Sequence, residues 1–237
     1  MSIIGVHVHP TEISDQEILS AFSHFELVRM QCPKDVGGAV RHYVDISPPT
    51  AKWLLILDQN QPDFDTVKHF RDNPKVVAWQ IGNEPDNPSF SGWAAKEYYN
   101  WLVSTKNSIL SNGGFGSKKI VAASSRSITQ NYPNTIKWNR NLVNLGLLDL
   151  VDVFAFHLYG SDFDPLSDVR KLFEKIRSLN KEIWITETGA KGTAGANYFQ
   201  KVQKVCTNRG INPDVIVRYA WIDKSLGYHV KEEVLSK

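Results

Sequence analysis

The stretch VVAWQIG (residues 76–82) decides the fold. Its side chains are apolar almost without interruption, which is typical of a strand buried on both faces of a parallel sheet. Seven other stretches share this character, and polar or amphipathic segments separate them. The eight predicted strands are Ile3–His9, Glu26–Met30, Trp53–Asp58, Val76–Gly82, Lys119–Ala123, Val151–Tyr159, Glu182–Thr186 and Val215–Trp221.

Three of the separating segments predict clear helices, at Ser91–Ser111, Pro165–Leu179 and Asn197–Arg209. In the second of these, apolar residues recur at steps of three and four, as on one face of an amphipathic helix. The connection Pro33–Ala51 carries two adjacent glycines and, near its end, two adjacent prolines, so we expect only a brief helix there. Sixteen residues follow the eighth strand, so the last helix is expected to be short or irregular.

Eight strands that alternate with helices over 237 residues predict an α/β fold. The length suits a single compact (β/α)8 TIM barrel, which we expect to span residues 1–237 as one domain. An open doubly wound sheet is the rival architecture. The chain lacks the glycine fingerprint of a dinucleotide-binding sheet, which favours the barrel.

The composition excludes several function classes. The chain has 27 Lys and Arg residues against 25 Asp and Glu residues, and no long basic run that would attract a nucleic acid. No apolar stretch is long enough to span a membrane, and Cys32 and Cys206 form no metal or redox spacing. We expect a monomer, cytoplasmic as the sequence is given because no signal peptide is visible, or secreted if this is a mature form.

The chemistry of such a barrel belongs at the carboxyl ends of its strands. Two glutamates stand at predicted strand ends, Glu84 after the fourth strand and Glu187 after the seventh. These two strands are three apart in a ring of eight, so their ends face each other across the mouth. Two facing carboxylates are what glycoside hydrolysis needs, because one protonates the leaving oxygen while the other attacks or activates water.

The motifs IGNEPD around Glu84 and WITETG around Glu187 resemble the acid/base and nucleophile motifs of clan A, a superfamily of retaining (β/α)8 glycoside hydrolases. The resemblance implies that Glu84 is the acid/base and Glu187 the nucleophile. It also implies that Asn83 bonds the 2-hydroxyl of the sugar and that Arg29, at the end of the second strand, lies close to the nucleophile. We expect the negative charge of Glu187 to raise the pKa of Glu84.

Further positions extend this resemblance. His157 and Tyr159 reproduce a histidine and tyrosine of the sixth strand, and Trp221 matches the tryptophan that forms the sugar platform after the eighth. The first strand, GVHVHP, is similar to that of relatives near the family 39 glycosidases, which makes His9 a substrate-side candidate. Where many members have a histidine after the third strand, this chain has Asp58 and Gln59, and Asp58 is a further supporting candidate.

The resemblance therefore implies a retaining glycosidase that cleaves a β-linked oligo- or polysaccharide by double displacement, without metal or organic cofactor. Two alternatives stand beside it. His7, His9 and His157 could build the metal site of an amidohydrolase-type barrel, although the fifth strand end offers no histidine and the fourth no bridging lysine. The second alternative is a barrel that binds glycans without cleaving them. The presence of both glutamates argues against it, because a binding protein does not need them.

Overall fold

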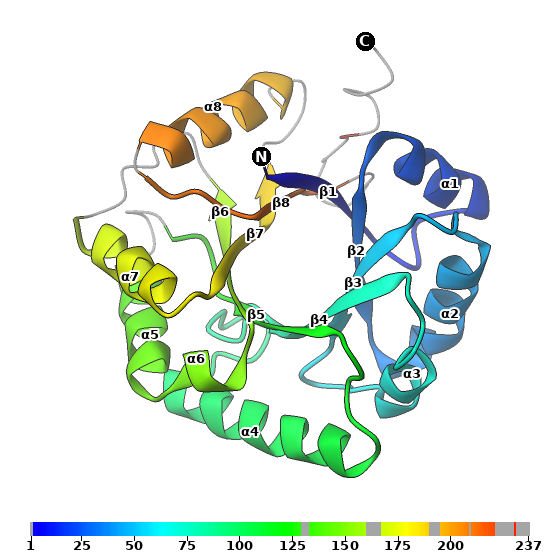
Figure 1. Ribbon diagram of the computed structural model, residues 1–237, viewed down its shortest axis with the longest axis horizontal. Coiled ribbons are helices and arrows are strands. Elements are labelled where there is room, and N and C mark those ends of the chain that lie inside the picture. The colour runs from blue at the N-terminus through cyan, green and yellow to red at the C-terminus, as the bar shows by residue number, and fades with distance from the viewer. Residues whose placement is uncertain are drawn as a thin grey trace.

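The computed structural model describes residues 2–128, 133–159, 167–189, 195–208, 210–220 and 230. Its strands form one parallel sheet that closes on itself, each strand pairing with the next and β8 with β1. Figure 1 shows this ring in the middle, with the helices around it. The strands are β1 (Ile3–Val8), β2 (Leu27–Cys32), β3 (Lys52–Leu57), β4 (Val76–Asn83), β5 (Lys119–Ser124), β6 (Val153–Tyr159), β7 (Glu182–Gly189) and β8 (Val215–Arg218).

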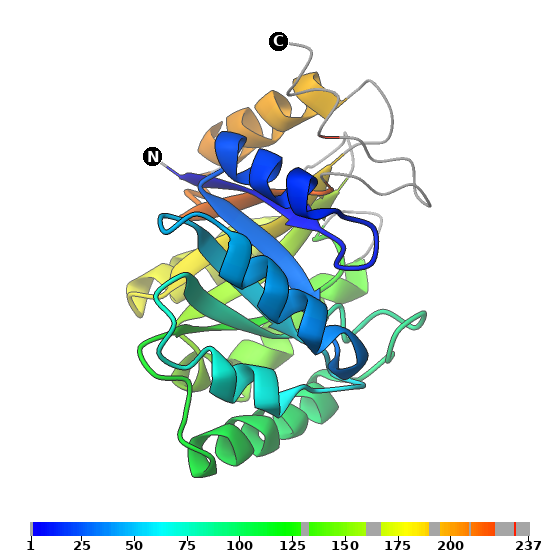
Figure 2. The ribbon, with the colours of Figure 1, turned by 90° about the vertical axis from the view of Figure 1, so that its right-hand side faces the viewer.

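The helices alternate with the strands along the chain, so the fold is the predicted (β/α)8 barrel. Figure 2, turned by 90°, shows helices on the outside of the sheet. They are α1 (Asp15–His24), α2 (Gly37–Ile46), α3 (Phe64–His69), α4 (Ala95–Ser111), α5 (Pro133–Asn144), α6 (Leu147–Leu150), α7 (Ser167–Ser178) and α8 (Gly195–Asn208), with a 3-10 turn, η1 (Lys34–Val36), before α2. Apart from Val230, the segment predicted as a short last helix lies outside the described residues.

The expectation of a brief helix after the second strand can be compared with the structure. The connection expected to hold only a brief helix contains α2, which is ten residues long. Its two glycines do not interrupt the helix, because they form its first two residues, and its prolines follow the last. Helix α1 begins at a capping box, in which Ser14 and Glu17 each accept a hydrogen bond from the other's backbone N–H.

Apolar side chains fill the barrel in one layer and join the sheet to the helices in another. The inner layer consists of Leu27, Leu54, Ala78, Val121, Val153, Ala155, Trp184, Val215 and Val217. Alternation along a strand sends every second side chain to the same face. On several strands, the residue two positions after a member of this layer therefore lies above it, at the carboxyl end of the barrel. These residues are polar, and they are Arg29, Gln80, His157 and Tyr219.

Candidate active site

Glu187 reaches the mouth of the barrel through an irregularity in β7. Phe156 of β6 pairs with Ile185, but the next residue, His157, pairs with Glu187, so the register passes over Thr186. Such an irregularity re-aims the following side chain. Glu187 thus stands beside His157, with its side chain 8% exposed.

A buried arginine and a tyrosine hold the Glu187 carboxylate. Arg29 Nη1 donates to Oε1 at 2.6 Å, and the Tyr159 hydroxyl donates to Oε2 at 2.7 Å. The Arg29 side chain is completely buried and also donates to His7, Gln80 and Asn83. This contact pairs the buried Glu187 carboxylate with a permanently charged guanidinium.

Glu84 has different partners. His157 Nδ1 lies 2.8 Å from its Oε1, and Asn87 Nδ2 donates to its Oε2 at 2.7 Å. Burial, the strongest single influence, raises the pKa of Glu84, but the hydrogen bond and charge of His157, followed by Asn87 and Arg126, together hold that pKa below its usual value. The sequence-based expectation of a raised pKa was therefore wrong, because it left out the histidine.

The backbone around Glu84 is held in an unusual conformation. Gly82 has a φ of 88° and Glu84 a φ of 43°, in the left-handed region that a residue before proline rarely adopts. Glu84 N–H donates to the Ser124 carbonyl at 2.8 Å. The side-chain amide of Gln59 bonds both the N–H and the carbonyl of Asn83, at 2.9 and 2.8 Å. Strain of this kind persists only where the surroundings fix it, and it is common at active sites.

The loop after β4 is also tied to its neighbour. The Asp86 carboxylate accepts the backbone N–H of Arg126 at 3.0 Å and the hydroxyl of Thr135 at 3.2 Å. Asp86 therefore joins the loop that carries Glu84 to the loop after β5.

His157 lies between the two glutamates. Its Nδ1 is 2.8 Å from an oxygen of Glu84 and 3.4 Å from an oxygen of Glu187. One oxygen of each glutamate and a ring nitrogen of His157 all lie within 4.8 Å of one another. Its Nε2 is buried and has no hydrogen-bond partner in the part of the chain that the structure describes. The two carboxylates predicted from sequence thus face each other across one histidine.

A group of aromatic rings borders the site on the side of β1 and β8. The ring of Tyr219, the first residue after β8, stacks on His7 with centroids 5.2 Å apart and meets Tyr159 edge-on at 6.2 Å. The Tyr219 hydroxyl lies 3.0 Å from His9 Nε2. Residues 215, 217 and 219 share one face of β8 and its continuation, so Tyr219 follows the inward alternation of the strand.

A family model described as the glycosyl hydrolase catalytic core matches residues 58–236, more than half of the chain. The chain belongs to this glycosyl hydrolase family. Glu84, His157 and Glu187 fall inside the matched region, whereas Arg29 precedes it. No curated protein matches the chain. The expected closeness to family 39 glycosidases is not confirmed by these comparisons.

Several solved glycosidase structures share the fold of this glycosyl hydrolase. The endo-1,4-β-mannanase of Rhizomucor miehei is 12% identical with a TM-score of 0.68, over 96% of this chain and 89% of that one. An endo-β-1,4-glucanase of Xanthomonas axonopodis pv. citri is 13% identical with a TM-score of 0.65, over 97% and 92%. A GH128 (subgroup II) endo-β-1,3-glucanase of Pseudomonas viridiflava is 15% identical with a TM-score of 0.63, over 95% and 89%. At these identities the likeness establishes the barrel alone.

The structure brings together most, but not all, of the predicted site residues. Those linked around Glu84 and Glu187 are Arg29, Asn83, His157 and Tyr159. Asp58 instead accepts the backbone N–H groups of Asn60 and Gln61 at 2.7 and 2.8 Å, so its carboxylate stabilises a turn. The predicted platform Trp221 lies outside the described residues.

The sequence-based prediction named Gln59 beside Asp58 but gave it no role, and it missed three other residues of this hydrogen-bonded group: Gln80, Asn87 and Tyr219. Alternation along β4 and β8 places Gln80 and Tyr219 on the inner face, and this was the available signal. For Gln59 and Asn87, which lie in loops, no comparable pattern exists.

Of the three histidines of the metal-site alternative, His157 lies in a group of three potential metal ligands, with Glu84 and Glu187, but His7 and His9 lie apart from it. Arg29 Nη1 donates to His7 Nδ1 at 3.0 Å, which occupies that lone pair and places a positive charge beside it. Burial and this charge hold the pKa of His7 well below its usual value. Within the described residues, His7 and His9 join no group of three metal-ligating side chains.

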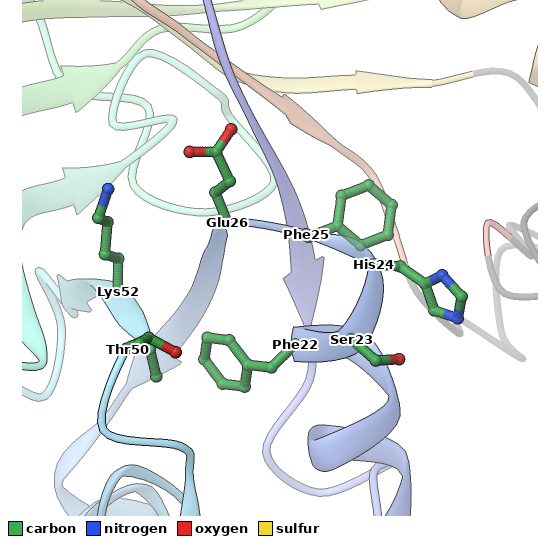
Figure 3. A pocket seen from close by; sticks show the side chains of 8 residues that line it. Phe22, Ser23, His24, Phe25, Glu26, Thr50 and Lys52 are labelled. Atoms are coloured by element: carbon green, nitrogen blue, oxygen red, sulfur yellow. The ribbon is translucent and has the colours of Figure 1, made fainter.

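A separate cavity of about 660 Å³ opens between the end of α1 and the beginnings of β2 and β3 (Figure 3). Phe22 and Lys52 line it, together with Glu26. It lies at the amino-terminal ends of the strands. In barrels of this kind, residues at that end contribute to stability and not to catalysis.

None of the described helices is long and apolar enough to cross a membrane.

Proposed function

We propose that this glycosyl hydrolase cleaves a β-linked oligo- or polysaccharide with retention of configuration, with Glu187 as nucleophile and Glu84 as acid/base. One observation carries the proposal: oxygens of the two carboxylates lie within 4.8 Å of each other, one carboxylate held by Arg29 and the other by His157. Retaining enzymes place their carboxyl groups about 5–5.5 Å apart, whereas inverting enzymes need roughly 6.5–9.5 Å to admit a water.

In the first step, an oxygen of Glu187 attacks the anomeric carbon while Glu84 gives its proton to the departing glycosidic oxygen. A glycosyl ester on Glu187 results, and the leaving sugar departs as an alcohol. Arg29 and Tyr159 hold the attacking carboxylate in place until it becomes an ester and loses its charge. Because both glutamate side chains are nearly buried, these charge interactions are only weakly screened.

In the second step, Glu84, now a carboxylate, removes a proton from a water molecule. The resulting hydroxide displaces Glu187 from the anomeric carbon, so two inversions give net retention. The low pKa that His157 imposes on Glu84 suits this step, because it keeps Glu84 ionised once its proton has left. The same low pKa means that the first step proceeds best at acidic pH.

The substrate class rests on two supports. Proteins of the same fold include enzymes named endo-β-1,4-mannanase, endo-β-1,4-glucanase and endo-β-1,3-glucanase. In this chain, the Asn83 amide oxygen accepts from Arg29, which leaves its NH2 group to donate to a hydroxyl of the bound sugar. Tyr159, which bonds Glu187, and its neighbour Tyr219 offer ring surface beside the carboxylates.

A trapping experiment tests the proposal. The protein is incubated with a 2-deoxy-2-fluoro-β-glycoside that carries a good leaving group, in gluco and manno forms. The fluorine slows both steps, and the good leaving group keeps the first step fast enough for the glycosyl ester to accumulate. Intact mass should rise by one glycosyl unit, and peptide mapping should place that unit on Glu187. The Glu187→Gln protein is the matched control and should remain unlabelled. Turnover of the parent glycoside with labelling elsewhere would overturn the assignment, and absence of any turnover would favour the glycan-binding alternative.

A further inference from the structure

Gln80 is a completely buried amide inside the barrel. It lies on β4 two residues after Ala78, so it follows the apolar inner layer toward the carboxyl end. A buried amide is costly unless its donors and acceptor are bonded. An apolar residue would fill this place without that demand, so the contacts of Gln80 require an explanation.

Its contacts connect two residues of the proposed site. Gln80 Oε1 accepts from Arg29 Nε at 3.0 Å. Gln80 Nε2 donates to the Gly82 carbonyl at 2.8 Å and to Asn83 Oδ1 at 3.2 Å. Arginine can only donate and a carbonyl can only accept, so the orientation of this amide is unambiguous.

The same logic fixes the amide of Asn83. Its Oδ1 accepts from Arg29 Nη2 at 2.7 Å and from Gln80 Nε2, so both of the oxygen's acceptor directions face inward. A flipped amide would place an NH2 group against two donors. Gln59 holds the backbone of Asn83 at the same time. The donor side of Asn83 therefore has one orientation, set by Gln80 and Arg29 together.

We propose that Gln80 is a positioning residue that sets the discrimination at carbon 2 of the sugar, by fixing the Asn83 amide as a hydrogen-bond donor. This inference rests on the proposed function, in which Asn83 meets the sugar undergoing cleavage. Hydrogen bonds to the 2-hydroxyl strengthen in the transition state of glycoside hydrolysis. If the Asn83 donor is held loosely, the rate of hydrolysis therefore falls specifically for substrates that carry this hydroxyl.

The test compares a substrate with its 2-deoxy analogue. Glucosides and mannosides differ only at carbon 2, so one 2-deoxy aryl glycoside is the analogue of both. The readout is the ratio of kcat/KM for the hydroxylated substrate to kcat/KM for the analogue. Gln80→Met preserves the volume but removes the amide, and Gln80→Glu preserves the shape but replaces the donor with an acceptor. Gln16→Met, an exposed glutamine on the outer helix α1, is the control.

In both Gln80 variants the ratio should fall by about tenfold or more, roughly the effect of one hydrogen bond, and in Gln16→Met it should equal the wild-type ratio. Equal losses on both substrates would leave the ratio unchanged and overturn the inference while leaving the proposed function intact. A wild-type protein that hydrolyses neither glycoside would refute the proposed function itself. If neither Gln80 variant folds, the residue is structural and the inference is also overturned.

Discussion

Arg29 Nη1 lies 2.6 Å from Glu187 Oε1, and no part of the Arg29 side chain is exposed to solvent. The contact distinguishes two glutamates that look alike in the sequence. Glu187 is paired with a permanent positive charge, whereas Glu84 is bonded to a histidine and an amide. Their proposed roles as nucleophile and acid/base follow from this difference.

Removal of each glutamate should therefore have a different chemical consequence. In Glu187→Ala no glycosyl ester can form, so glycosides with good and poor leaving groups should both lose activity. Azide in the vacated space should then yield an inverted product. In Glu84→Ala an aryl glycoside can still load Glu187, but the second step should slow by roughly 10²–10⁴-fold. An initial burst should appear, and azide should give a retained product.

The measurement is NMR of the glycosyl azide anomers, with Glu26→Ala as control because Glu26 lines the cavity at the other end of the barrel. Glu26→Ala should keep wild-type activity. The same anomer from both glutamate variants would show that the roles are assigned wrongly.

The pH profile should depend on His157. This residue holds the pKa of Glu84 down, so His157→Phe should raise that pKa, since burial then acts with less opposition. Glu84 must be protonated in the first step, so activity declines as pH rises through its pKa. The alkaline limb of kcat/KM should accordingly move to higher pH in His157→Phe. His157→Gln, which keeps a donor without a charge, should show a smaller shift, and a limb that moves to lower pH would contradict the electrostatic account.

Two adjacent glycines at the start of α2 should respond oppositely to alanine. A Cβ on Gly37 would overlap Oδ2 of Asp63, a carboxylate that also bonds Thr66 and caps α3, so Gly37→Ala should destabilise the protein by about 2 kcal/mol. A Cβ on Gly38 meets nothing within 4 Å, so Gly38→Ala should stabilise it by about 0.4–1 kcal/mol. Urea unfolding measures both, and equal effects would show that the packing around Gly37 is looser than described.

Chelation should leave activity unchanged. Arg29 occupies one nitrogen of His7 and places a positive charge beside it, which opposes a metal ion there. Activity on an aryl glycoside is compared before and after treatment with EDTA, followed by metal analysis of the protein. Loss of activity that zinc restores would support the amidohydrolase-type alternative.

Much of this arrangement could be predicted from the sequence because two of its signals are strong. Continuous apolar runs marked every strand, with ends within two residues of those observed at β4 and β5. Carboxylates at the predicted strand ends identified Glu84 and Glu187 as candidate site residues. These signals depend on local pattern, which the barrel preserves.

The remainder depends on long-range contacts that a sequence does not display. The pKa of Glu84 is raised by burial and lowered by His157, which lies 73 residues away along the chain. Gln59, next to the predicted Asp58, bonds the backbone of Asn83, and nothing in its residue type distinguishes it from a surface amide. The bend that aims Glu187 is likewise a property of the pairing between β6 and β7, and not of either strand alone.

The anomeric configuration of the first product tests the central claim most directly. A β-linked substrate is hydrolysed with wild-type protein inside an NMR tube, and the anomeric proton is recorded before mutarotation mixes the two forms. Double displacement through Glu187 predicts that the β anomer appears first and the α anomer only later. If the α anomer appears first, the two carboxylates act on a water molecule in a single displacement, and Glu187 is not a nucleophile.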